Sequence, residues 1–471
     1  MSGLFSTLGS SVKALNAHSR AIEIAGKNLA NVNNAAYARQ RVIYGDRGTV
    51  VTADGAQSLG LEALAVQQLR DALLDRQVMR ETALKGSFEA EQDILGRAQA
   101  GLGQSIDRSA SATATSSNAS TGGLAAALDD FFNAFQSLAA RPTDVGERQT
   151  LLQKAAILTD RFQQTDARLA QVQSDVDTSI ATDVDDANRL LSTIADLNAQ
   201  IGRIEVGAPG TAIDLRDQRQ AKLEELSAKL PIEVRNSTDG QIQVVMKDAA
   251  NADVVLVDKA TVSGPVAFDG TNITGGASAT TLVFSSGKIY GQLSARDGAV
   301  QELRDSLDAL AQQLVTSVNA AYNPTSAPGG DFFNAAGATA GTISLRAGLT
   351  ATNLTAGTGA AGDNSIALAV AAIASQSFST SGGDAVDGTL SQFFSRSVSN
   401  LGQALASANS RVEDQTNIAN LVKSQRDSVS GVSLDEEMAD LVRFQRAFQA
   451  SSRVFSVVDE LLDTVVNRLG R

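Results

Sequence analysis

The sequence predicts a mainly α-helical protein with a β insert, comprising a terminal α-helical coiled coil, an elongated helical-bundle rod domain and a small antiparallel β domain. Large apolar residues recur every seven positions over long stretches. All six prolines lie between residues 142 and 328, which leaves both terminal thirds free of helix breakers. Only 4% of the residues are aromatic, which favours helices packed through Ala, Leu and Val over one thick globular core.

The C-terminal end carries a coiled-coil seam that predicts a long helix beginning at residue 434. The seam residues are spaced seven apart, with further apolar residues in the turns between them. Ser433 and Glu436 have the spacing of a capping box at the start of this helix. The predicted seam consists of Leu434, Leu441, Phe448, Phe455, Leu462 and Leu469, with Met438, Phe444, Val458 and Val465 between them.

The N-terminal end carries a matching but shorter stripe, formed by Leu8, Val12, Leu15, Ile22 and Leu29. The two stripes can pair with each other or with neighbouring copies of the chain. Because the N-terminal stripe is shorter, pairing of two helices alone would leave apolar surface uncovered. We therefore expect other copies to cover the remainder, with the ends folding as they assemble.

Three interior seams predict helices that return along one another. The first keeps a seven-residue register across residues 148–205, through Phe162, Leu169, Val176, Leu190, Leu197 and Ile204. Two others lie at residues 300–318 and 398–412. Antiparallel packing of these helices would bury all three stripes.

A change of period between these helices predicts the β insert. Apolar residues alternate at 232–234 and 242–246 around a turn at Asp239-Gly240, and strand-like runs follow at 254–257, 280–284 and 289–293. Residues 325–390 are rich in Gly, Ala, Ser and Thr, and are read as a flexible linker or as an ordered surface excursion.

These patterns place the domain boundaries in a nested order. Residues 1–45 and 430–471 form the paired terminal coiled coil, or axial core domain. Residues 46–230 and 293–429 form the helical rod domain, with the loop-rich excursion at 325–390. Residues 231–292 form the antiparallel β domain. Such nesting brings the two ends of the chain together.

Composition argues against several classes of function. The chain has no cysteine and a single histidine, His18, so thiolate and histidine metal clusters are excluded. The formal net charge of −13 opposes binding of nucleic acid. No long apolar run predicts membrane insertion, the N-terminus lacks the features of a cleaved secretory signal, and no catalytic or cofactor motif is present. We predict a non-enzymatic protein without cofactors. The acidic positions Asp183, Asp185 and Asp186 are interpreted as a solvated helix face rather than a calcium site.

Two sequence motifs, about 400 residues apart, carry a resemblance to a known family. The first is NLANVNNAAYARQ at residues 28–40, which includes Asn28, Asn31, Asn33 and Tyr37. The second is LDEEMA at 434–439 followed by FQRAFQA at 444–450. Together they resemble the bacterial flagellar rod/hook axial protein family. Family members commonly have a glycine just before the tyrosine, where this chain has Ala35-Ala36, so the turn there can differ.

Within that family the resemblance is closest to the junction protein between hook and filament. A long helical block precedes the β insert here, whereas rod and hook proteins turn to β structure soon after the first helix. The resemblance implies a structural protein of the extracellular bacterial flagellum, exported as an unfolded chain without a cleaved signal peptide. It also implies a homo-oligomeric ring or tubular layer. The implied partners are the hook protein, the second hook-filament junction protein and a flagellar export chaperone.

Alternatives remain open within and outside the flagellum. Flagellin and the second junction protein share paired terminal coils, although the Asn-rich motif argues against both. A surface adhesin is the alternative from another class, because the β insert is expected outermost. The predicted assembly interface is the sum of the two stripes and the first motif, namely Leu8, Val12, Leu15, Ile22, Asn28, Leu29, Asn31, Asn33, Tyr37, Leu434, Met438, Leu441, Phe444, Phe448, Phe455, Val458, Leu462, Val465 and Leu469.

Overall fold

A computed structural model describes residues 2–34, 36–45, 48–52, 55–58, 60–102, 123–360 and 362–465. The chain forms two compact units. Unit 1 comprises Met1–Lys85, Asp183–Gly287 and Gln415–Arg471, and unit 2 comprises Gly86–Thr182 and Lys288–Asp414. Three long helices contribute residues to both units: α2 (Ala72–Gly101), α4 (Val145–Glu205) and α9 (Leu390–Ser430).

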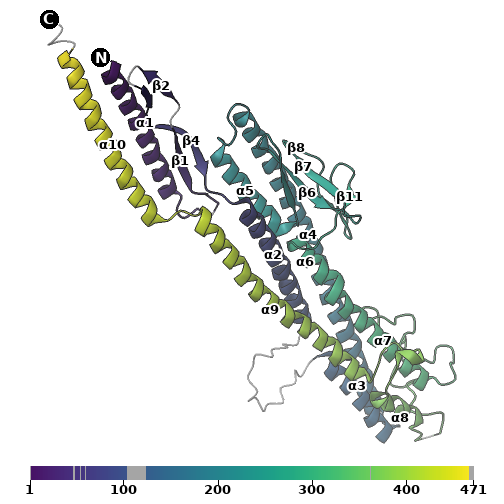
Figure 1. Ribbon diagram of the computed structural model, residues 1–471. Helices are drawn as coiled ribbons and strands as arrows, with labels where there is room; N and C mark the ends of the chain where they lie inside the picture. Colours follow the sequence, from purple (N-terminus) through teal and green to yellow (C-terminus); the bar gives the residue numbers. More distant parts are fainter. Residues whose placement is uncertain are drawn as a thin grey trace. The chain divides into compact units, whose positions relative to one another are not determined.

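The two ends of the chain meet in unit 1. Helix α1 (Ser2–Ala30) lies beside α10 (Leu434–Asp463), and the two run antiparallel (Figure 1). The long C-terminal helix begins where the sequence predicts. The predicted capping box is wrong, because the Ser433 side chain makes no capping hydrogen bond and Glu436 instead accepts a hydrogen bond from Arg39.

Strands follow α1 directly, which the sequence analysis does not predict. Strand β1 (Gln40–Gly45) pairs antiparallel with β4 (Glu62–Gln68), and β2 (Thr49–Thr52) pairs with β3 (Gly55–Ser58). The helical structure expected from residue 46 therefore begins only at α2. The sequence analysis preferred the junction protein partly because rod and hook proteins turn to β structure soon after the first helix. This chain does the same, so that argument is wrong.

The β insert also belongs to unit 1. One sheet has the order β5-β6-β7-β8, with bounds Glu233–Asn236, Ile242–Lys247, Asp253–Asp258 and Thr261–Val262. The other has the order β11-β10-β9, with bounds Thr280–Thr281, Ile273–Gly275 and Ala267–Phe268. Gly240 has a φ of 77° in the predicted Asp239-Gly240 turn. The strand predicted at 289–293 is wrong, because these residues lie in α6 (Lys288–Ala295). Five residues are too few for apolar alternation to distinguish a strand from a helix.

Buried polar side chains hold the first sheet against α4 and α5 (Ile213–Lys229). The Asn198 amide donates to the carbonyl oxygens of Ile242 at 3.0 Å and Lys259 at 2.8 Å. Its own oxygen accepts a hydrogen bond from the Arg219 guanidinium at 2.6 Å. Because every one of these groups is paired, the polar contact fixes the sheet without leaving an unsatisfied buried atom.

The acidic positions on α4 differ from the solvated face expected of them. Asp183 is only 3% exposed and accepts from Lys229 Nζ at 2.5 Å, and Asp186 accepts from the same nitrogen at 3.1 Å. Asp185 is exposed. The pair therefore serves to attach α5 to α4. Among the described residues, no group of three His, Asp or Glu side chains is placed to hold a metal ion.

Unit 2 has an aromatic core. Four fully buried phenylalanines pack with ring centroids 5.0–5.8 Å apart, in mostly tilted or edge-to-face pairs. They come from α3 (Leu124–Ala140) and from the segment after α7 (Gln301–Tyr322), and are Phe131, Phe135, Phe332 and Phe333. A π-helical segment, η1 (Arg296–Val300), precedes α7.

Residues 325–390 form an ordered excursion on unit 2 rather than a flexible linker. They contain α8 (Ser365–Ala372), the 3-10 turns η2 (Ile373–Ser375) and η3 (Thr380–Gly382), and the bridges Phe333↔Leu345 and Phe378↔Gly388. Asp side chains that accept hydrogen bonds from backbone N–H groups hold these loops: Asp363 accepts from Thr358 and Ser365, and Asp384 accepts from Ser379.

The long interior helices occur where the seams predict them. Along α4, Phe162, Leu169 and Val176 are at most 2% exposed. Ile204, the last predicted seam residue, is 51% exposed, because it lies in the final turn before the α4–α5 corner. No described helix is long and apolar enough to span a bilayer.

Candidate assembly site

The α1–α10 pair is the candidate assembly site, and only some of the predicted stripe residues are buried in the free chain. On α1, the buried apolar residues are mostly small: Ala17, Ala21 and Ala25 are at most 2% exposed, and Ile24 is 3% exposed. On α10, Val458 and Leu462 are the buried apolar residues. A helix lined with alanine lets its partner approach closely, but it covers little of a wide apolar helix. Larger side chains on both helices therefore remain accessible.

Asn28 stands at the base of this pair with all its hydrogen-bonding capacity used. Its amide nitrogen donates to the Gln40 carbonyl at 2.8 Å and to Glu437 Oε2 at 2.9 Å. Its oxygen accepts from the Gln40 N–H at 3.0 Å and from the Tyr37 hydroxyl at 2.8 Å. The carboxamide thus makes the two hydrogen bonds to the Gln40 backbone that a neighbouring β-strand would make. The same side chain also bonds to Glu437 of α10.

Arg39 joins the same base to the end of α9 and the start of α10. Its backbone N–H donates to the Ser430 carbonyl at 2.8 Å. Its guanidinium lies 2.6 Å from Glu436 Oε2 and 2.7 Å from Glu437 Oε1. Since Glu437 is 3% exposed, its charge is compensated inside the protein by Arg39 and Asn28. We call Asn28, Tyr37, Arg39, Gln40, Glu436 and Glu437 the base cluster.

A second buried group ties the base cluster to α5. Asp217 accepts from Arg70 at 2.6 Å and from Gln68 at 2.7 Å, and receives the backbone N–H of Ala38 at 3.5 Å. Burial raises the pKa of Asp217 to about 6, although the nearby Arg70 acts to lower it. Burial, followed by the charge of Asp217, raises the pKa of the Tyr37 hydroxyl, which stays protonated and donates to Asn28.

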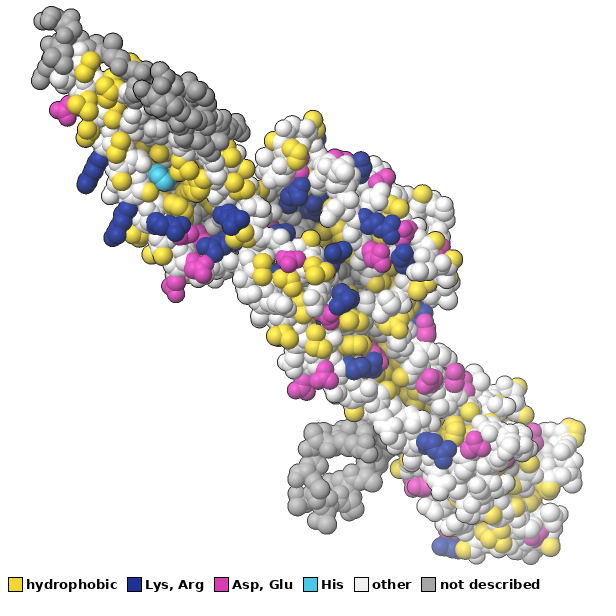
Figure 2. All heavy atoms as spheres, in the orientation of Figure 1, with side chains coloured by type: hydrophobic (Ala, Val, Ile, Leu, Met, Phe, Trp, Pro, Cys, Tyr) yellow, Lys and Arg dark blue, Asp and Glu magenta, His cyan; other side chains and the backbone are white. Residues whose placement is uncertain are grey.

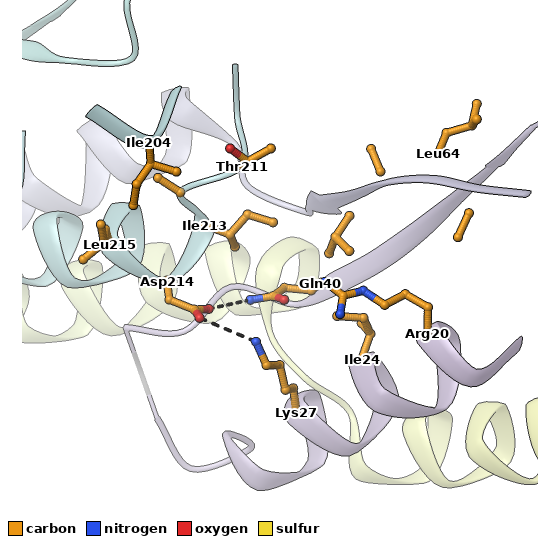
Figure 3. Close-up of a pocket in the computed structure, with 14 residues that line it drawn as sticks. Arg20, Ile24, Lys27, Gln40, Leu64, Ile204, Thr211, Ile213, Asp214 and Leu215 are labelled. Atoms are coloured by element: carbon orange, nitrogen blue, oxygen red, sulfur yellow. Dashed lines mark hydrogen bonds and ion pairs between the residues drawn. The ribbon is translucent and has the colours of Figure 1, made fainter. Parts of the chain in front are cut away.

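A groove of about 490 Å³ opens beside the base cluster, between α1, β4 and the α4–α5 corner (Figure 3). Asp214 lines it, accepts from Gln40 Nε2 at 3.2 Å and lies 3.6 Å from Lys27 Nζ. The lining mixes aliphatic side chains, such as Ile24 and Ile213, with polar ones. Because the Asp214 side chain is 63% exposed, this carboxylate remains accessible to solvent.

The predicted interface residues fall into three environments. Asn28, Val458 and Leu462 are buried within the chain's own helix pair. Val12, Asn33, Leu434, Met438 and Phe448 are exposed. Half-buried positions are Leu8, Leu15, Ile22, Leu29, Asn31, Tyr37, Leu441, Phe444, Phe455 and Val465. Leu469 and Ala35 lie outside the described residues. Asn31 acts as a helix cap, since its amide donates to the Lys27 carbonyl at 3.0 Å.

Sequence reasoning missed the charged half of this site. Arg39 and Glu436 belong to the two motifs, but nothing in the sequence shows that these residues, 397 positions apart, form an ion pair. Arg70 and Asp217 carry no motif at all. The only available signal was the coincidence of an Arg in one motif with three acidic residues in the other.

Comparison with known proteins gives matches from one group. Residues 109–333 match the family model described as "Flagellar hook-associated protein FlgK helical domain". Residues 423–469 match the model "Flagellar basal body rod FlgEFG protein C-terminal". The second match covers the end of α9 and the whole described part of α10.

Similar whole proteins carry one name. Flagellar hook-associated protein 1 of Bacillus subtilis is 27% identical over 100% of this chain and 99% of its own length. The Escherichia coli protein of that name is 26% identical over 69% of this chain and 58% of its own length. A solved structure, the flagellar hook junction protein FlgK from Burkholderia pseudomallei, aligns with a TM-score of 0.45 at 21% identity, over 55% of this chain and 46% of that chain.

Proposed function

Because this chain belongs to the flagellar hook-associated protein 1 family, a structural family of the bacterial flagellum, we propose that it assembles at the junction between hook and filament through the outer faces of α1 and α10. The observation that supports this proposal most is that α1 and α10 already pack against each other and still expose large apolar side chains to solvent. Figure 2 shows hydrophobic side chains, in yellow, on the surface of this helix pair at the upper left.

The exposed apolar side chains of α10 lie along two edges of the helix. One edge holds Leu434, Met438 and Phe448, which are 50%, 47% and 36% exposed. At 100° per residue, Val454, Val457 and Leu461 fall on the other edge, and they are 49%, 57% and 49% exposed. The middle of the outer face is mostly charged, with Arg446, Arg453 and Glu460, and also holds Val442, which is 43% exposed. α10 therefore has an apolar edge on each side of a charged ridge.

Two apolar edges on opposite sides of one helix suit contact with two neighbours. A contact that joins one edge of a copy to the other edge of the next copy is heterologous, and it closes into a ring or continues as a helical layer. On α1, Phe5 at 57% and Val12 at 41% exposure add to the surface that neighbours would cover. The copies themselves are thus the first partners in this proposal.

The remaining partners follow from the position of the junction. A layer between hook and filament must contact the hook protein on one side and the second hook-filament junction protein on the other. An export chaperone would cover the edges of α10 before assembly, because exposed apolar stripes promote aggregation. The proposal includes export as an unfolded chain without a cleaved signal peptide, with which the absence of cysteine is compatible.

The test places a charge on one apolar edge. The double variant Val457→Asp/Leu461→Asp is added to isolated hooks, and incorporation is followed by electron microscopy. Because both side chains are exposed, we expect circular dichroism of the free chain to be unchanged while incorporation is lost. The matched control is Gln449→Glu, which adds a negative charge on the charged ridge of the same helix and is expected to incorporate normally. Normal incorporation of the double variant would refute the proposed interface.

A further inference from the structure

The buried apolar residues of α1 are mostly small. Ala17, Ala21 and Ala25 are buried, and Ile24 is the one larger side chain buried beside them. A shift of one heptad toward the N-terminus of α1 puts Ser10, Ala14 and His18 in the places of Ala17, Ala21 and Ala25, so two of the three positions keep a small side chain. Packing of small residues therefore separates the native register from shifted ones only weakly, and a helix pair of this kind needs another feature to select one alignment.

The base cluster supplies a feature that does not repeat. Asn28 is 1% exposed and Glu437 is 3% exposed, and they are joined directly at 2.9 Å. In an antiparallel helix pair, two residues that lie level with each other have residue numbers whose sum is nearly constant along the pair. A slip of seven residues in one direction would therefore place Ala21, instead of Asn28, level with Glu437. The carboxylate would then lose its amide donor, and Asn28 would be level with Ser430, beyond the start of α10, and would lose its acceptor. Leaving a buried charge and a buried amide without their partners is costly.

We infer that the Asn28–Glu437 contact sets the register of the α1–α10 pair. Two further contacts anchor the pair to the rest of unit 1. The Gln40 backbone holds the Asn28 carboxamide from the β1 side, and Arg39 holds Glu437 while its N–H binds Ser430. Asn28 and Glu437 are thus positioning residues: they decide which residues of the two helices stand side by side and where the outer apolar edges lie. The inference concerns the free chain, and it holds or fails independently of the proposed assembly.

The absence of native cysteine makes the register directly measurable. Spin labels are attached to Ser19→Cys on α1 and Arg453→Cys on α10, both of which are exposed positions. In the native register Ser19 is level with Arg446, so the labels are offset by about 10 Å along the helix axes. The slip described above increases the offset to about 20 Å. The distance between the labels then becomes longer, by less than the change in offset because the helices are also separated laterally, and pulsed electron double resonance measures it.

The decisive variant is Asn28→Leu/Glu437→Leu in the labelled chain. Replacing a buried ionic or polar pair by apolar residues of similar volume often preserves stability, so a loss of register can be observed in a protein that still folds. We expect retained helix content by circular dichroism, together with a second distance population that is longer than the native one. The control Asn16→Leu changes an exposed amide of the same helix and should give the native single distance. A single native distance in the double variant would overturn the inference.

Two single variants extend the test. Glu437→Gln keeps an acceptor for the Asn28 amide, and it should retain the native distance even if the protein melts at a lower temperature. Asn28→Asp places a second carboxylate against Glu437 with almost no change in shape. If the double variant loses its helix content, Asn28→Asp decides: a shifted population supports the register role, and a single native distance refutes it.

Discussion

Helices α4 and α10 carry the same heptad pattern and have opposite environments. Along α4, seam residues such as Leu158, Phe162 and Leu169 are completely buried. Along α10, only Val458 and Leu462 among the apolar residues are buried, and Val454 and Val457 remain about half exposed. A heptad repeat therefore indicates that a helix packs along one seam. It does not indicate whether the partner helix belongs to the same chain or to another molecule.

The difference arises from the size and number of the neighbours. In unit 2, α4 meets side chains of α7 and the loop residues beyond it, including the Arg304–Asp166 ion pair at 2.9 Å. α10 packs mainly on α1, whose buried residues are mostly alanines. Substitutions on the two helices should therefore give very different losses of stability in the free chain.

The largest expected effect is on α4. Phe162→Ala removes a fully buried ring and leaves a cavity, so the free energy of unfolding should fall by about 3–5 kcal/mol. Denaturant titration followed by circular dichroism measures the loss. A loss below about 1 kcal/mol would mean that the α4 seam is packed no better than the outer face of α10.

Close helix packing in unit 2 gives the next effect. A Cβ at Gly291 would lie 1.9 Å from the Ser87 carbonyl oxygen, so Gly291→Ala must push α6 from α2. We expect a loss of about 2–3 kcal/mol. The control Gly96→Ala has no atom within 4 Å of its new Cβ and should stabilise α2 by up to about 1 kcal/mol. Equal melting temperatures for the two variants would contradict the close contact.

A smaller effect concerns pH at the base of the terminal pair. The pKa of Asp217 is raised to about 6 in the folded chain, above its unfolded value, so the folded state binds the extra proton. The stability from this group is present below about pH 4 and is lost as pH rises to about 6. Asp217→Asn removes this titration. The unfolding free energy of the parent should therefore fall, relative to that of the variant, by on the order of 2 kcal/mol between pH 4 and pH 7. Denaturant titrations at several pH values measure both free energies. The same pH dependence in parent and variant would contradict the assignment.

The smallest effect is expected on α10. Phe448→Ala in the free chain removes a ring that is already 36% exposed and should cost less than about 1 kcal/mol. Incorporation into hook ends should fall more steeply than stability, because the ring is free to contact a neighbour. A loss as large as that of Phe162→Ala would erase the contrast between the two helices.

The periodicity of apolar residues predicted the long helices correctly and did not identify the short elements. The seven-residue repeats located α4, α7, α9 and α10, because a stripe that long is compatible only with a helix. The run at 289–293 was assigned to a strand and lies in α6. The β1–β4 hairpin was not predicted, since half of its residues are polar and one of its edges is completed by the Asn28 side chain.

The polar part of the candidate site was the least predictable. The motif residues Asn28 and Tyr37 were identified as important, but they were expected on the assembly interface. In the structure, they bind each other and the backbone of β1. Sequence spacing gives no information about a contact between residues 409 positions apart, such as Asn28 and Glu437.

The order of residues by itself determined the helical class, the long seams, the site of the β insert and the family resemblance, because each depends on local periodicity or on a contiguous motif. Only the tertiary structure decided which stripes are buried, which charges meet and which side chains of α10 remain uncovered. The physical reason is that burial is a property of pairs of surfaces. A stripe of leucines looks the same along the chain whether its partner is a neighbouring helix or another molecule.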